Sequence, residues 1–334
     1  MLSESRRRKL ELLIRSLKSG DLKRAQAILR AGAAPRASGG SAPTEPGGFA
    51  PAAGGVSFPP GEPLPLELAV PGVEVGLRPW DIAGSRGAPR DATRCGPPFA
   101  GGKLWLVRRA LAEISGDGEA IQREYVSILK GARQRFDELE ASVGLCHVAN
   151  GLPEGPLFLD IETCGLAGSV IFLVGLMSCR DGALVFEQLL ARDYSEEPAM
   201  LAALAERLAE AAVLVTFNGK SFDVTMLRER GIFHNLDLGT IPPHLDLLHE
   251  SRRVYRGKVP NCRLQTLEQC LCRRRRVGDI PGSAIPAAYH AFVSTGDARN
   301  LKAILHHNLL DLLTMGQLLC AILTGQMPDD LGSA

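Results

Sequence analysis

The chain has 334 residues, enough for one sizeable domain with additional segments. Its 38 basic and 37 acidic residues give a net charge of +1, so the overall composition gives no signal for nucleic-acid binding. The N-terminus lacks the apolar core of a signal peptide, and no apolar run suggests a membrane span. The eight cysteines are scattered, which is typical of a reducing compartment. We therefore expect a soluble, cytoplasmic protein with no membrane partner.

The first 63 residues divide into two segments of different composition. Helical periodicity over residues 3–31, broken at Gly20-Asp21, predicts a helical hairpin, to which we assign residues 1–33. Residues 34–63 consist mainly of Pro, Gly, Ala and Ser. Such a segment has too few large apolar residues to form a core, so we expect a disordered linker.

The remaining chain contains a lead-in, a larger domain and a short tail. Residues 64–150 read as short strands or irregular chain up to about residue 90, with apolar pieces at 64–70 and 73–77, followed by two helical patterns, around 107–114 and 121–139. We assign residues 151–325 to the main domain and residues 326–334 to a tail.

The main domain is predicted to be of the α/β class, with a mixed sheet flanked by helices. Apolar runs rich in β-branched and aromatic residues predict strands at 157–162, 170–178, 183–190 and 213–217. We expect the first three strands to form an antiparallel meander. Helical patterns cover 197–211, 221–230, 264–271 and 299–324.

Two acids interrupt the first of these apolar strands. Asp160 and Glu162 are two residues apart, so they point to the same face of the strand and lie a few ångströms from each other. Two carboxylates held that close repel each other unless a positive charge lies between them. A divalent cation with oxygen ligands is the usual solution. The alternative is an exposed strand end with solvated acids.

Two further acids lie at positions that suit the same site. Asp223 begins a predicted helix just after a strand, where helix capping alone would also explain it. Asp311 lies within an apolar helix, which is costly unless the carboxylate is paired or bound to metal. His307 precedes Asp311 by four residues and shares its face, whereas His306 lies about 140° away around the helix axis. This spacing favours His307 as the partner of Asp311.

These four acids, in this order and with a histidine before the last, resemble the DEDD (DnaQ-like) superfamily of 3′–5′ exonucleases, which has a ribonuclease H-like fold. The resemblance covers about residues 155–325, and its nearest branch is the bacterial YprB-type ribonuclease H-like domain. The three exonuclease motifs are Phe158-Leu-Asp-Ile-Glu-Thr-Cys-Gly-Leu166, Phe217-Asn-Gly-Lys-Ser-Phe-Asp223 and His307-Asn-Leu-Leu-Asp311. Further likenesses are His244-Leu-Asp-Leu-Leu248, Leu264-Gln-Thr-Leu-Glu268 and Asp279-Ile-Pro-Gly282 with Ile285-Pro286 and Tyr289.

The resemblance implies a metal-dependent exonuclease that hydrolyses terminal phosphodiester bonds of nucleic acid, in the 3′–5′ direction and on DNA rather than RNA. Two Mg²⁺ or Mn²⁺ ions would be held by the four acids, with His307 as general base. His306, which has the five-residue spacing of the histidine-type members, is the alternative base. A role in DNA repair follows, with the N-terminal helices as a docking surface for a helicase or another repair partner. The alternatives are an RNA-processing exonuclease, which the residues do not distinguish, and a non-catalytic nucleic-acid-binding protein with the same fold.

Substrate-binding residues are expected in two places. In the second motif, Asn218, Lys220 and Phe222 would contact the terminal nucleotide, although Phe222 is equally explained as core. Between residues 250 and 279 there are nine basic residues against three acids. Within this segment we expect the side chains of four consecutive arginines to bind phosphates. They are Arg273, Arg274, Arg275 and Arg276. A solvated charge run is the alternative.

Two departures and one ambiguity accompany the motifs. Cys164 stands where the first motif usually has a second Thr, and the Gly-rich stretch that follows is short. Asp246, at a predicted strand end, is interpreted as a carboxylate that supports the metal-binding acids without binding metal itself, with helix capping as the alternative. A metal site at Cys262, Cys270 and Cys272 is disfavoured, because no Cys-x-x-Cys pair accompanies them.

Overall fold

The computed structural model describes residues 63–77, 101–136, 141–148, 153–166 and 168–328. These residues all belong to one compact unit, Phe49–Ala334. The predicted helical hairpin, almost all of the predicted linker and most of the predicted tail lie outside the described residues.

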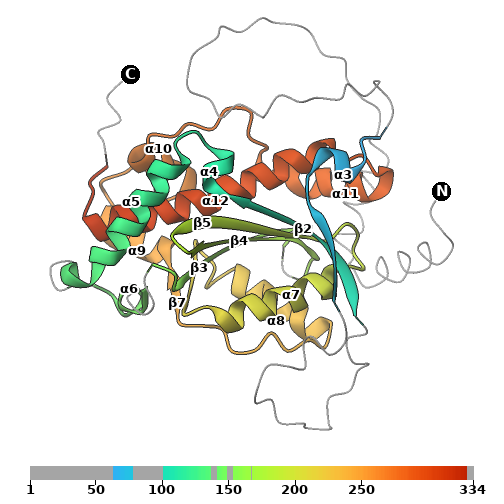
Figure 1. Ribbon diagram of the computed structural model, residues 1–334, viewed down its shortest axis with the longest axis horizontal. Coiled ribbons are helices and arrows are strands. Elements are labelled where there is room, and N and C mark those ends of the chain that lie inside the picture. Colours follow the sequence, from blue (N-terminus) through green and yellow to red (C-terminus); the bar gives the residue numbers. More distant parts are fainter. Residues whose placement is uncertain (1–62, 78–100, 137–140, 149–152, 167, 329–334) are drawn as a thin grey trace, which may run out of the picture. The chain divides into compact units, whose positions relative to one another are not determined.

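A seven-stranded mixed sheet forms the centre of this unit (Figure 1), in the order β1-β2-β5-β4-β3-β6-β7. The strands are β1 (Val73–Leu77), β2 (Gly102–Ala110), β3 (Pro156–Thr163), β4 (Ile171–Arg180), β5 (Ala183–Leu190), β6 (Val213–Thr216) and β7 (His244–Asp246). The expected antiparallel meander of β3, β4 and β5 is confirmed. β6 pairs with β3 in parallel, and β7 pairs with β6 in the same way. The predicted α/β class with a mixed sheet is therefore confirmed.

The prediction of a helix around 107–114 was wrong for most of its length. Residues 102–110 form β2, and only Leu111–Ile114 (α4) are helical. Val107, Ala110, Leu111 and Ile114 do have helical spacing. However, β2 pairs with β1 on one side and with β5 on the other, and this pairing outweighs the local pattern. Thus, the sheet takes two strands from the region that we had assigned to a lead-in.

Helices cover both faces of the sheet (Figure 1). On one face, α12 (Arg299–Thr324), α5 (Gly118–Gly131) and α10 (Leu264–Cys272) share a core with Phe158 of β3. On the other, α7 (Glu197–Glu210) and α8 (Asp223–Phe233) share a core with Leu157 and Leu159. The remaining helices are α3 (Leu66–Ala69), α6 (Val143–Val148), α9 (Leu247–Tyr255) and α11 (Ile285–Thr295), with short 3₁₀ turns at Ala132–Arg135 and Gly282–Ala284.

The long helix α12 lies inside the protein. By length and composition this 26-residue helix could cross a membrane, which we had not expected of any segment. However, 78% of its most apolar window is buried within the fold, as is usual for a core helix. The unit is accordingly an α/β domain with one buried apolar helix.

Gly175 of β4 allows α12 to approach the sheet closely. A Cβ atom at this position would overlap the side-chain amide of Asn308 on α12. Gly175 is also the neighbour of Asp160 across the β3–β4 pair. The close approach therefore brings the third motif against the strand that carries the first.

Candidate active site

Asp160 is held by an amide network that spans the sheet and α12. The Asn308 Nδ2 group donates to a carboxylate oxygen of Asp160 at 2.8 Å and to its backbone oxygen at 3.3 Å. In turn, Gln188 of β5 donates its Nε2–H to Asn308 Oδ1 at 2.9 Å and to the backbone oxygen of Leu305 at 2.7 Å. Both amide side chains are fully buried. Neither residue was predicted to belong to the site, although Asn308 lies between His307 and Asp311 in the third motif.

The two acids of β3 carry perturbed pKa values. Burial raises the pKa of Asp160 well above its ordinary value, and the negative charges of Asp311, Glu162 and Asp223 raise it further. Burial likewise raises the pKa of Glu162 to about 8, with contributions from Asp311 and Asp223. Because the pKa of Asp160 responds to the other three acids, and that of Glu162 to Asp311 and Asp223, the four carboxylates form one electrostatic cluster.

Asp223 joins this cluster from the N-terminus of α8. Its side chain is buried, and burial raises its pKa to about 7, although backbone N–H groups of Asp223 itself and of Ile161 oppose the shift. The approach to α8 is a turn in which Asn218 adopts a left-handed conformation, with φ of 67°. Asn tolerates this region better than most residues.

Asp246 fixes that turn and also caps a helix. One of its carboxylate oxygens accepts the backbone N–H groups of Asn218, at 2.9 Å, and of Leu248, at 3.0 Å. The other accepts the backbone N–H of Lys220 at 3.1 Å. Both interpretations of Asp246 therefore describe the same side chain, which begins α9 and positions the segment that leads to Asp223.

His307 lies between two acids on the site-facing side of α12. Its Nδ1 is 2.9 Å from both carboxylate oxygens of Asp279, and its Nε2 is 3.5 Å from an oxygen of Asp311. An N–H donated from Nδ1 to Asp279 leaves Nε2 able to accept a proton. The structure thus places His307 beside Asp311, as the helical spacing predicts. Its role as general base remains a prediction.

Arg276 supplies a positive charge at the fourth acid. Its Nη2 is 2.6 Å from Asp311, its Nε is 2.6 Å from Glu268, and its Nη1 is 3.2 Å from Asp279. Asp311 has a raised pKa because of its burial, and the Arg276 charge and hydrogen bond oppose this shift. The side chain of Arg276 is only 6% exposed, so these contacts lie away from bulk water.

The four consecutive arginines do not form one surface. Arg274 also turns inward, where it contacts Glu268 at 3.0 Å and the side-chain oxygen of Gln317. Arg273 and Arg275 are exposed. Arg274 and Arg276 would have to break ion pairs to acids before they could bind a phosphate, and a binding role for Arg273 and Arg275 remains a prediction.

The three second-motif residues that were expected to contact the nucleotide differ in their exposure to solvent. Asn218 and Lys220 are exposed. Phe222 is partly buried and packs against the core beneath α7 and α8, which supports its interpretation as a core residue.

The donor set suits a hard divalent cation. Among the described residues, no group of three or more His, Cys, Asp or Glu side chains is already arranged to hold a metal ion. Even so, carboxylate oxygens are the ligands that Mg²⁺ and Mn²⁺ prefer. Burial and mutual repulsion raise the pKa values of Asp160 and Glu162, so a cation between these carboxylates would stabilise their charged forms. Asp311 already has a guanidinium partner, Arg276. The residues therefore fit the metal ions that the resemblance implies.

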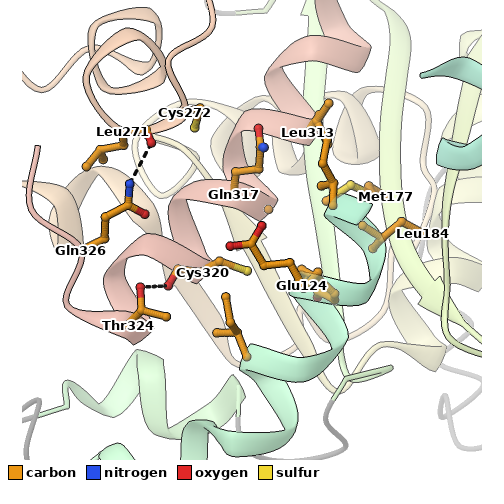
Figure 2. A pocket seen from close by; sticks show the side chains of 14 residues that line it. Glu124, Met177, Leu184, Leu271, Cys272, Leu313, Gln317, Cys320, Thr324 and Gln326 are labelled. Atoms are coloured by element: carbon orange, nitrogen blue, oxygen red, sulfur yellow. Dashed lines mark hydrogen bonds between the residues drawn. The ribbon is translucent and has the colours of Figure 1, made fainter. Parts of the chain in front are cut away.

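A separate cavity is lined by residues of α5, α10 and α12 (Figure 2). It has a volume of about 230 Å³, and its lining includes Glu124, Cys272, Gln317 and Cys320. Burial raises the pKa of the Cys272 thiol to about 11, so this thiol is protonated at neutral pH. None of the four acids lines the cavity, and we do not include it in the candidate site.

Comparisons with known proteins agree with this architecture. The family model of the RNase_H superfamily matches residues 157–322. The chain is also 33% identical, over 194 residues, to a Bacillus subtilis (strain 168) protein named "Uncharacterized protein YprB". This similarity covers 54% of the present chain and 47% of YprB, so the chain spans about half the length of that relative. The matched region contains all four acids and His307. Residues 157–322 are therefore a nuclease-type domain of the ribonuclease H superfamily, with a ribonuclease H-like fold.

Proposed function

We propose that this protein is a metal-dependent 3′–5′ exonuclease that hydrolyses terminal phosphodiester bonds, on DNA in preference to RNA. The observation that carries the proposal is the buried cluster of Asp160, Glu162, Asp223 and Asp311 beside His307, in which the other acids raise the pKa values of Asp160 and Glu162. Nucleic acid is the expected partner, since its phosphodiester bond is the one that such nuclease-type domains cleave. We extend the proposal to a cytoplasmic role in DNA repair. A helicase or other repair partner would dock on residues 1–33.

The chain's own side chains divide the chemistry between them. When bound by the four acids, two Mg²⁺ or Mn²⁺ ions would supply the charge that activates water and stabilises the leaving oxygen. His307 would accept the proton of the attacking water at Nε2. Asp279, which contacts Nδ1, would fix the ring and stabilise the imidazolium that forms. Asn308 would keep the Asp160 carboxylate in one orientation through its 2.8 Å hydrogen bond.

The test is a hydrolysis assay with Mn²⁺ on single-stranded DNA, duplex DNA and RNA in parallel, each labelled at the 5′ end. An exonuclease of 3′–5′ polarity would shorten the labelled strand stepwise and leave circular single-stranded DNA intact. Cleavage of the circle would contradict exonuclease action. Preferential cleavage of RNA would favour the RNA-processing alternative.

Substitution of the acids tests the metal assignment. Asp160→Ala and Asp223→Ala should each lower the rate by about a hundredfold or more, because removal of a group that stabilises transition-state charge costs several kcal/mol. Glu210→Ala is the control, since Glu210 is exposed at the end of α7. Thermal unfolding should show that all three variants remain folded. If both Asp variants keep more than about one per cent of wild-type activity, the two-metal assignment is wrong.

A further inference from the structure

Two neighbouring cavities share three lining residues and are described together as one groove, and one of them borders Asp311. The first, of about 330 Å³, is bordered by Asp311 and by the start of α10. The second, of about 650 Å³, extends past the end of β6 and along α9. Asn261, Arg263 and Leu264 line both cavities. We call this combined hollow the α9–α10 groove. Cavities of about 300–1,000 Å³ are the size that holds drug-sized molecules, so each is large enough for a nucleotide unit.

Three arginines line the groove without an acidic partner. Arg252, Arg256 and Arg263 are all exposed to solvent. Within the described part of the chain, none of the three forms an ion pair with Asp or Glu. By contrast, neighbouring Arg253 contacts Glu250 at 3.0 Å. Guanidinium groups are well suited to phosphates, and three unpaired ones along a groove match a repeating polyanion.

The same groove also presents apolar surface. Phe217, Leu248, Val259 and Pro260 contribute to the lining of the larger cavity. Unpaired bases have flat faces that pack on aromatic and apolar side chains, in addition to their phosphates. A paired duplex covers those faces and offers mainly its backbone. The combination of arginines and apolar residues therefore fits an unpaired strand better than a duplex.

We infer that the α9–α10 groove binds an unpaired stretch of nucleic-acid strand whose end lies at the four acids. Phosphates contact Arg252, Arg256 and Arg263, and bases pack against Phe217 and the Val259-Pro260 segment. The inference rests on the proposed function for the direction of the strand, because the groove reaches the cluster at Asp311. It assigns substrate binding to residues other than the inward-turned Arg274 and Arg276.

A binding assay tests the groove independently of hydrolysis. A fluorescein-labelled 12-nucleotide single-stranded DNA is titrated in EDTA at several NaCl concentrations, and its anisotropy gives the Kd. The triple variant R252A/R256A/R263A should weaken binding at least about tenfold at low salt. It should also reduce the slope of log K against log salt by about 2, since each phosphate contact to a single strand contributes about 0.7. The control is Arg123→Ala, an exposed arginine of α5 outside the groove, which should bind as the wild type does.

Two further measurements distinguish a failure of the groove assignment from a failure of the proposed exonuclease function. With Mn²⁺ present, the triple variant should lose at least about tenfold more in kcat/KM on the 12-nucleotide strand than on the p-nitrophenyl ester of thymidine 5′-monophosphate, which is too short to fill the groove. If neither substrate is hydrolysed by the wild type, the proposed function fails, and the binding series still decides the groove. A wild-type Kd and salt slope in the triple variant would overturn the groove assignment. If the wild type binds a blunt duplex as tightly as the single strand, and the triple variant loses affinity for both equally, the assignment of the groove to an unpaired strand is wrong.

Discussion

Arg276 allows a direct test of whether the acid cluster needs a cation. This guanidinium group contacts Asp311 and Glu268, each at 2.6 Å, from a side chain that is only 6% exposed. Arg276→Gln would remove the positive charge and leave the two carboxylates buried. Removal of one partner of a buried ion pair typically costs about 3–5 kcal/mol, because the remaining charge is uncompensated. For a domain of this size, 1 kcal/mol corresponds to about 2–4 °C in Tm, so the metal-free variant should unfold about 10 °C below the wild type.

Metal ions should restore part of this loss. In the wild type, a cation at Asp311 competes with the Arg276 charge for the same carboxylate, whereas Arg276→Gln removes this competitor. A ligand at about 100 times its Kd stabilises the folded state by about 2.7 kcal/mol. We therefore expect saturating Mn²⁺ to raise the Tm of the variant by several degrees more than it raises the Tm of the wild type. Thermal unfolding in EDTA and in Mn²⁺ measures both shifts.

Arg274→Gln provides a matched control. Arg274 contacts the same Glu268 at 3.0 Å and is also largely buried, at 14% exposed, but no contact between it and Asp311 is found in the described structure. Its loss should lower the Tm without a larger response to Mn²⁺. If Arg276→Gln and Arg274→Gln gain equally from Mn²⁺, or if Arg276→Gln gains no more than the wild type, then Arg276 does not compete with a cation at the cluster.

Three other predictions concern the same groups. His307→Ala should lower kcat by about a hundredfold or more and remove the acidic limb of its pH profile, whereas His306→Ala should stay near the wild type; the reverse result would move the base to His306. Because the pKa of Glu162 is raised from 4.5 to about 8, its contribution to the stability of the metal-free protein is present below about pH 4.5 and is lost as the pH rises through 8. In EDTA, the Tm of Glu162→Gln relative to the wild type should therefore rise over this window, and a constant difference would contradict the shift. Gly175→Ala should cost about 1–3 kcal/mol in unfolding free energy, since its methyl group would overlap Asn308; an unchanged midpoint in urea would show that α12 can move away.

Much of the fold was predictable from local sequence patterns. Strands β3 to β6 and helices α7, α8, α10 and α12 lie within a few residues of their predicted bounds. Strands buried on both faces form continuous apolar runs, so the pattern and the structure report the same property. β1, β2 and β7 were not predicted with the same clarity. Their pairing partners are distant in sequence, and β7 has only three residues.

The composition of the segment could not show which of the four consecutive arginines point into the protein and which point to solvent. Arg273 ends α10 in a left-handed conformation, with φ of 51°. Beyond it the residues alternate, so that Arg274 and Arg276 turn inward while Arg275 is exposed. A count of basic residues treats all of them alike. Only the position of Glu268, fixed by the packing of α10 against α12, distinguishes the inward pair.

Glu268, Asp279 and Asn308 were predicted only as parts of motifs. In the structure, all three hold side chains of the site in place. Glu268 and Asp279 hold Arg276, Asp279 also holds His307, and Asn308 holds Asp160. Asn308 contacts an acid of the cluster directly, whereas Glu268 and Asp279 contact residues that lie next to the cluster. Glu268 and Asp279 are themselves acidic, so they add to the negative charge of the site. Their role is to hold in place the side chains of Arg276 and His307. The remaining imbalance has to be met by protons or by added cations, and these two compete for the same oxygens. The raised pKa values and the proposed metal binding are therefore two consequences of one arrangement of buried carboxylates.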